Sequence, residues 1–139
     1  MLCFEISWGN IMTTEYKTYK IKDFIRKTPK GELDIDKSMR IVWEIAAAAG
    51  FHHDHNLLVD LRQTEPLSNF GDVLKVATEF AKYQGVFQNK IAVVIPNTPD
   101  RLERAQLFIE ALGEVTFKIE YFTAFEEAIE WFSEIIKYP

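Results

Sequence analysis

The chain has 139 residues, 47% of them hydrophobic and 27% charged, which predicts one globular domain large enough to bury its own core. Its formal net charge of −5 disfavours nucleic acid as a partner, because nucleic-acid-binding domains normally present a basic face. The single cysteine, Cys3, excludes an internal disulfide and fits a reducing, cytoplasmic location. We find no apolar run of membrane-spanning length and no secretion-signal pattern.

The first residues stand apart from the pattern that follows. Met12 has the appearance of a native start, so we expect an N-terminal extension over 1–11 and a single domain over 12–139. If the extension is ordered, alternating apolar residues predict an added edge strand there. These residues are Phe4, Ile6 and Trp8.

An extended segment and a helix come next. Residues 16–28 predict extended chain, and the turn-forming residues at 28–31 predict a bend or hairpin. A helix over 37–49 follows, with Asp34 or Asp36 as its N-cap. Its apolar residues recur at helical spacing, and Gly50 is expected to end it as a C-cap.

Two short apolar runs, at 56–61 and 90–96, organise the rest of the chain. Each is rich in β-branched residues, lacks polar alternation, and is bounded by polar or turn-forming residues. Such runs are typical of strands buried on both faces, which indicates a parallel sheet covered by helices.

Two more helices surround the second of these strands. After a polar loop at 62–67, Ser68 or Asn69 is expected to cap a helix with an apolar face. That face consists of Val73, Val76, Ala77 and Phe80. A third helix begins with Thr98 as its cap and Pro99 at its first position, and it stops at Gly113.

The end of the chain predicts an edge strand and a long amphipathic helix. Apolar and polar residues alternate over 115–122, as expected at a sheet edge. Thr123 and Glu126 then have the spacing of a capping box. The following helix is expected to continue to the chain end, with an apolar side wider than a surface helix needs. The excess lies at Trp131, Ile135 and Tyr138.

The order of these elements resembles the STAS superfamily, and within it the SpoIIAA-like branch of small stand-alone proteins. The resemblance covers about residues 16–135 and implies an α/β fold, a superhelix of β-α units with a mixed, largely parallel sheet and about four helices. It rests on Leu57-Leu-Val-Asp60, Ile91-Ala-Val-Val-Ile-Pro96 and Phe122-x-x-x-x-Glu127-Ala128-x-x-Trp131.

One functional motif of that superfamily is altered here. Its anti-sigma-factor antagonists are phosphorylated on a serine in an Asp-Ser-Ser-Gly motif at a helix start. When the motif is aligned on Gly71, Asn69 occupies the acceptor position and cannot be phosphorylated, while Ser68 lies one residue early. The departure argues against a phospho-switch. A helix start still offers free N–H groups to an anion, whereas the simpler interpretation makes these residues an N-cap.

The candidate catalytic and metal-binding residues are few. The cluster of His52, His53 and His55 lacks a distant cysteine or histidine to complete a metal set, so we predict neither metal nor cofactor. Asp60, at the end of a buried strand, lies where α/β sheets place ligands. We favour its binding loop backbone N–H groups over catalysis. With no recognisable catalytic motif, we expect a protein that is not an enzyme.

An aromatic surplus near the chain end leaves three interpretations besides a well-filled core. These residues, Phe122, Phe125, Trp131 and Phe132 with Trp43, would form a homodimer or partner surface, line an apolar cavity, or dock on a membrane. The acidic side of the last helix disfavours anionic lipid, so we place membrane association last.

These observations give three functional hypotheses. The first is a non-catalytic regulatory protein-interaction module that uses Asp60, Ser68, Asn69 and Gly71. The second is a carrier or sensor of a small apolar ligand in a cavity under the C-terminal helix. That cavity would be lined by Phe125, Trp131 and Phe132. The third is an enzyme that uses the Asp60 region.

Overall fold

A computed structural model describes residues 2–9 and 14–136 and has a parallel four-stranded sheet at its centre. Its strands lie in the order β3 (Phe24–Lys27), β5 (Asn56–Asp60), β7 (Ile91–Val94) and β8 (Ile119–Phe122). Each neighbouring pair runs parallel, so the predicted α/β class with a largely parallel sheet is confirmed.

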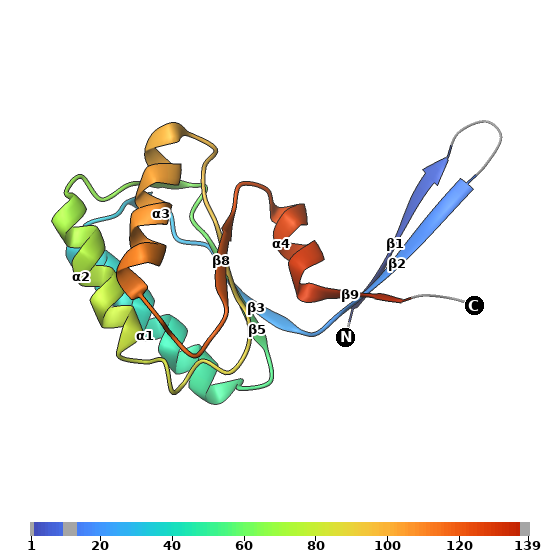
Figure 1. The fold of residues 1–139 in the computed structure, drawn as a ribbon, viewed down its shortest axis with the longest axis horizontal. Helices are drawn as coiled ribbons and strands as arrows, with labels where there is room; N and C mark the ends of the chain where they lie inside the picture. The colour runs from blue at the N-terminus through green and yellow to red at the C-terminus, as the bar shows by residue number, and fades with distance from the viewer. Residues whose placement is uncertain (1, 10–13, 137–139) are drawn as a thin grey trace.

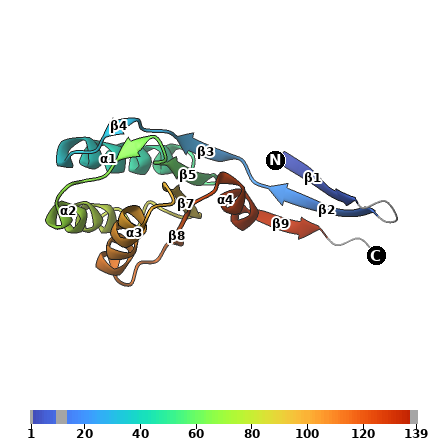
Figure 2. The same ribbon diagram turned by 90° about the horizontal axis from the view of Figure 1, so that it is seen from above.

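The helices of the described residues cover this sheet unequally (Figures 1 and 2). Three pack on one face, and one short helix packs on the other. The three are α1 (Ile35–Phe51), α2 (Phe70–Ala81) and α3 (Pro99–Leu112). The fourth is α4 (Phe125–Phe132). The predicted number of helices is therefore confirmed.

The central strand β5 is buried at every position because both faces of the sheet are covered. Its side chains alternate: Leu57 and Val59 join the core beneath α1–α3, whereas Leu58 joins the core beneath α4. This burial explains why apolar and polar residues do not alternate in the run at 56–61.

The predicted N-caps of the first three helices are confirmed. For α1 and α2, the structure selects one of the two predicted candidates. Asp34 accepts a hydrogen bond from Lys37 N in α1, Asn69 rather than Ser68 caps α2, and Thr98 caps α3. Gly113 ends α3 with φ of +67°, a conformation that favours glycine. The predicted C-cap at Gly50 is wrong, because α1 continues through Gly50 to Phe51 and His52 is the cap.

The last helix is shorter than predicted. It begins at Phe125 after Ala124, so Thr123 is not its N-cap, and it ends at Phe132. Ile135 lies instead in strand β9 (Ser133–Ile136), which pairs antiparallel with β2 (Thr14–Ile21). Ile135 and Ile136 are β-branched residues, which favour strands. Because β2 is available for pairing, this segment forms a strand rather than one further helical turn. Tyr138 lies outside the described residues.

Strand β9 belongs to a second sheet that projects from the body of the molecule (Figures 1 and 2). Its order is β1-β2-β9, and β1 (Leu2–Gly9) pairs with the whole of β2. The edge strand predicted within 1–11 is thereby confirmed, whereas Met12 lies outside the described residues. The described helices include none that is both long and apolar enough to cross a membrane.

The predicted strand at 115–122 is also shorter, since β8 covers only its second half. Its expected position at a sheet edge is confirmed. A bend rather than a hairpin follows β3: β4 (Gly31–Glu32) pairs in parallel with β6 (Thr64–Glu65), inside the predicted loop at 62–67.

An aromatic cluster joins α2 and α3 to the segments that lead into β7 and β8. Phe80 lies 4.9 Å from Phe87, 5.6 Å from Phe117 and 5.8 Å from Phe108 between ring centroids. Rings at these separations add favourable contacts to the burial of their apolar area.

Truncating the centre of this cluster should destabilise the fold. We expect Phe80→Ala to lower the free energy of unfolding by about 3–5 kcal/mol, because it leaves a cavity among three rings. Urea unfolding followed by circular dichroism measures this change. The control, Phe51→Ala, removes an exposed ring at the end of α1 and should cost less than about 0.5 kcal/mol. Equal losses in the two variants would contradict the packing described.

Candidate functional site

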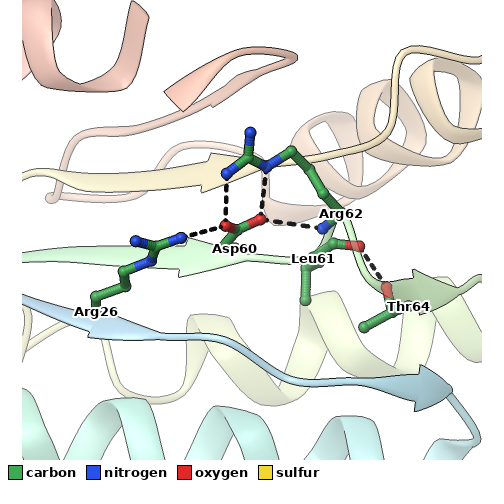
Figure 3. A network of polar contacts seen from close by, with 5 residues as sticks. All are labelled: Arg26, Asp60, Leu61, Arg62 and Thr64. Atoms are coloured by element: carbon green, nitrogen blue, oxygen red, sulfur yellow. Dashed lines mark hydrogen bonds and ion pairs between the residues drawn. The ribbon is translucent and has the colours of Figure 1, made fainter. Parts of the chain in front are cut away.

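Asp60 lies at the carboxyl end of β5 and binds two arginines on the α4 face of the sheet (Figure 3). Its side chain is only 2% exposed. Arg62 donates from Nε to Oδ1 at 2.9 Å and from Nη2 to Oδ2 at 2.8 Å, and its backbone N–H donates to Oδ1 at 3.1 Å. Arg26, from β3, donates to Oδ2 at 2.8 Å. Both carboxylate oxygens are therefore fully engaged.

These contacts keep Asp60 ionised. Hydrogen bonds from the Arg62 side chain, followed by those from its backbone and from Arg26, hold the pKa of Asp60 far below its usual range despite burial. The same pair raises the pKa of Arg62. The sequence predicted loop amides as the partners of Asp60, and one such amide is present. The Arg26 guanidinium was not foreseen because it lies 34 residues away, and the Arg62 guanidinium, only two residues away, was also not predicted as a partner.

The predicted residues Ser68, Asn69 and Gly71 lie at the start of α2, on the opposite face of the sheet from the Asp60 carboxylate. Asn69 Oδ1 accepts a hydrogen bond from Gly71 N at 2.7 Å. A Cβ atom at Gly71 would come within 3.0 Å of that oxygen, so the glycine leaves room for the cap. Ser68 is exposed.

The predicted aromatic residues of α4 pack against the sheet and one another. Phe132 lies 5.6 Å from Phe24, and Trp131 lies 5.9 Å from Phe132, between ring centroids. Arg26 lies 4.9 Å above Phe125, which joins this helix to the Asp60 network. The sheet surface beneath α4 is thus filled with aromatic side chains.

The apolar cavity lies on the other face, between the sheet and α1–α3. Its volume is about 160 Å³. Side chains from all three helices and from β5 and β7 line it, among them Val42, Val59, Val76, Ile91, Ala105 and Phe108. Ser38, Arg101 and Arg104 also line this cavity, and the sequence analysis overlooked all three.

Arg101 is the most deeply buried of these cations, with 7% of its surface exposed. Its guanidinium donates to the carbonyl oxygen of Thr64 at 2.7 Å and to the hydroxyl of Thr64 at 3.0 Å. Burial lowers the pKa of Arg101, and nearby Arg104 lowers it further, whereas Asp100 opposes them. The sequence did contain a signal for the burial of Arg101, because this residue shares one helical face with Ala105, Phe108 and Leu112.

The histidine cluster offers no metal centre in the described part of the chain, where no group of three metal-ligating side chains comes together. His55 Nδ1 lies 2.8 Å from Asp54, and its ring lies 5.1 Å from that of His52.

Comparison with known proteins finds no matching family model and no matching curated protein. A solved structure with 13% sequence identity covers 94% of this chain and 93% of its own, with a TM-score of 0.48. It is an uncharacterised protein from Shewanella loihica PV-4, of the DUF3478 family, described as having a SpoIIAA-like fold. That is the fold implied by the sequence resemblance.

Neutralising Asp60 should destabilise the protein, because two guanidinium groups would lose their common anion. We expect Asp60→Asn to lower the free energy of unfolding at pH 7 by about 2 kcal/mol. This lies below the usual range for a buried pair, because the arginines are 44% and 38% exposed and partly screened by solvent. Urea unfolding measures this loss, with Glu120→Gln as an exposed control.

The same network predicts a pH dependence. The folded protein holds the Asp60 pKa below the unfolded value of about 3.9, so its stabilisation is complete above that value and is lost as pH falls. Between pH 5 and pH 2, the wild type should therefore lose stability more steeply than Asp60→Asn. Parallel curves would show that this carboxylate is not the group responsible.

Proposed function

We propose that this protein binds a small, largely apolar molecule in the cavity beneath α1–α3, as a carrier or sensor. The cavity itself carries this proposal: at about 160 Å³ it far exceeds the voids that native cores normally leave. An engineered apolar cavity of about 150 Å³ in another protein binds benzene. A ligand with an apolar body of about six carbon atoms therefore fits in size.

The lining supports an apolar occupant. Apolar side chains beside an unfilled space lack van der Waals contacts on that side, and a bound apolar molecule would supply them. The proposed ligand would lie on the opposite face of the sheet from α4, whereas the sequence analysis expected a ligand under the C-terminal helix.

The hydrogen bonds and the lowered pKa of Asp60 support a binding function rather than catalysis by this residue. A general base needs a free lone pair, but both oxygens of this carboxylate accept hydrogen bonds from arginine groups. Its lowered pKa further weakens it as a base. We therefore assign Asp60 a structural role at the end of β5. The lone cysteine supports a cytoplasmic setting for the protein.

A second function, docking of a protein partner, is favoured by one observation at the start of α2. Phe70 and Leu74 are exposed and lie one helical turn apart, beside Ser68 and Asn69. Neighbouring exposed apolar side chains are typical of interaction surfaces. A regulatory partner or a second copy of the chain would cover them.

Filling the cavity tests the ligand-binding proposal. Ala105 lines the cavity on α3, so Ala105→Leu should abolish binding of toluene, used as a neutral probe in isothermal titration calorimetry. Ala111→Leu, on an exposed position of the same helix, should bind toluene like the wild type. Failure of the wild type to bind toluene, or equal binding by both variants, would reject the cavity as the site.

Urea unfolding serves as the folding control for this experiment. Added carbon atoms that fill existing space should change the stability of Ala105→Leu by no more than about 1 kcal/mol. Loss of binding in a variant of nearly unchanged stability is then attributable to occupied space.

A further inference from the structure

A groove of about 470 Å³ lies at the amino ends of the parallel strands. Asn56 is the first residue of β5, Lys90 directly precedes β7, and Lys118 directly precedes β8. These three strands are neighbours in the sheet, so the fold brings the three positions together. Lys20 and Lys22 reach the same groove from the end of β2 and the link that follows it. Residues far apart in the chain thus line one groove.

The lining of this groove is basic although the chain as a whole is acidic. The described lining residues include no aspartate or glutamate but four lysines, which are Lys20, Lys22, Lys90 and Lys118. The whole chain, by contrast, has 16 basic and 21 acidic residues. Ammonium groups that face one space repel each other, and an anion between them removes that repulsion. The local excess of positive charge therefore favours an anionic occupant.

The ammonium groups are accessible to such an occupant. Lys22 and Lys118 are exposed, and Lys118 has no ion pair with a described residue. Lys22 Nζ lies 3.5 Å from Asn89 Oδ1, longer than a usual hydrogen bond. Lys90 Nζ donates to the carbonyl oxygen of Trp131 at 2.6 Å and lies 5.1 Å from the centroid of its ring, so this group is held in place. An ammonium has three donors, and Lys90 therefore retains others for a ligand.

The use of lysine indicates a phosphate group. A guanidinium matches a carboxylate through two parallel hydrogen bonds, whereas an ammonium is a compact point charge. No arginine occurs among the described lining residues. A phosphate ester has three terminal oxygens and nearly two negative charges near pH 7, so ammonium groups from several directions can each contact an oxygen.

The groove also has room for more than a phosphate. Its volume of about 470 Å³ lies within the usual range of small-molecule sites. Phe117 and Phe132 belong to its lining, beside the amide side chains of Asn56, Gln88 and Asn89. These residues offer apolar contacts and hydrogen bonds to an organic group attached to the phosphate.

We propose that this groove binds a small organic phosphate. Lys22, Lys90 and Lys118 would contact the phosphate oxygens, while the organic part lies along the aromatic and amide side chains. The groove and the apolar cavity share no described lining residue. The inference therefore concerns a second ligand site and does not rest on the proposed function of the cavity.

Probes of similar shape test the charge requirement. Phenyl phosphate carries nearly two negative charges near pH 7, and phenyl sulfate carries one. Two-dimensional amide NMR spectra, recorded during titration, give both the affinity and the location of binding. We expect the amide signals of Lys90 and Lys118 to shift and phenyl phosphate to bind at least fivefold more tightly than phenyl sulfate. Inorganic phosphate, which lacks the ring, should bind several-fold more weakly than phenyl phosphate.

Substitutions of single lysines test the contacts. Lys22→Gln and Lys118→Gln should each weaken phenyl phosphate roughly fivefold, the upper end for an exposed ion pair. Both positions are exposed, so the spectra of both variants should remain those of the folded protein. The matched control Lys30→Gln removes an exposed lysine from the bend between β3 and β4 and should keep the affinity within about twofold of the wild type. Ala105→Leu, which fills the apolar cavity, should also bind phenyl phosphate normally.

Several results would overturn this proposal. Equal affinities for the phosphate and sulfate esters would reject a requirement for two charges, and equal weakening by Lys30→Gln would show a general effect of net charge. Equal affinities for phenyl phosphate and inorganic phosphate would reject the organic part of the ligand. Loss of phenyl phosphate binding in Ala105→Leu, with unchanged binding in Lys118→Gln, would assign the ester to the apolar cavity instead of the groove.

Discussion

Burial of β5 on both faces is the constraint on which the rest of the structure depends. Every residue of the strand is buried, so each face of the sheet needs its own cover of helices. The strand also ends in a charged residue, Asp60, which must be neutralised where the chain leaves the sheet. Arg26 from the neighbouring β3 and Arg62 from the following turn provide that neutralisation.

The helices pack differently on the two faces of the sheet. The short helix α4 places aromatic rings directly on one face and joins the Asp60 network through Arg26 and Phe125. On the other face, three longer helices enclose a cavity even though an aromatic cluster fills the adjacent space around Phe80. Dense packing normally extends through a core of this size, and this unfilled volume is the observation on which the ligand-binding proposal rests.

The sequence predicted the elements whose signals are local. Apolar runs located β5 and β7, and Asp34, Asn69 and Thr98 marked helix starts, because a cap acts on the next few residues of its own chain. The sequence did not predict the features that depend on contacts with residues far away in the chain. The end of α4 depends on the ladder offered by β2, and the roles of Arg26 and Arg101 depend on residues more than 30 positions away. The sequence also did not indicate the apolar cavity between the sheet and α1–α3, because its walls come from segments far apart in the chain.

One turn connects the two polar regions at the carboxyl edge. Leu61 follows Asp60, and its carbonyl oxygen accepts a hydrogen bond from the Thr64 hydroxyl at 2.6 Å (Figure 3). The same hydroxyl accepts a hydrogen bond from Arg101 beneath α3. On the α4 face an anion is fully matched by cations, whereas on the cavity face two cations have only neutral or exposed partners. The turn at Thr64 therefore joins Arg101 to the segment that leaves β5 at Asp60, so both polar regions depend on the geometry of this one turn.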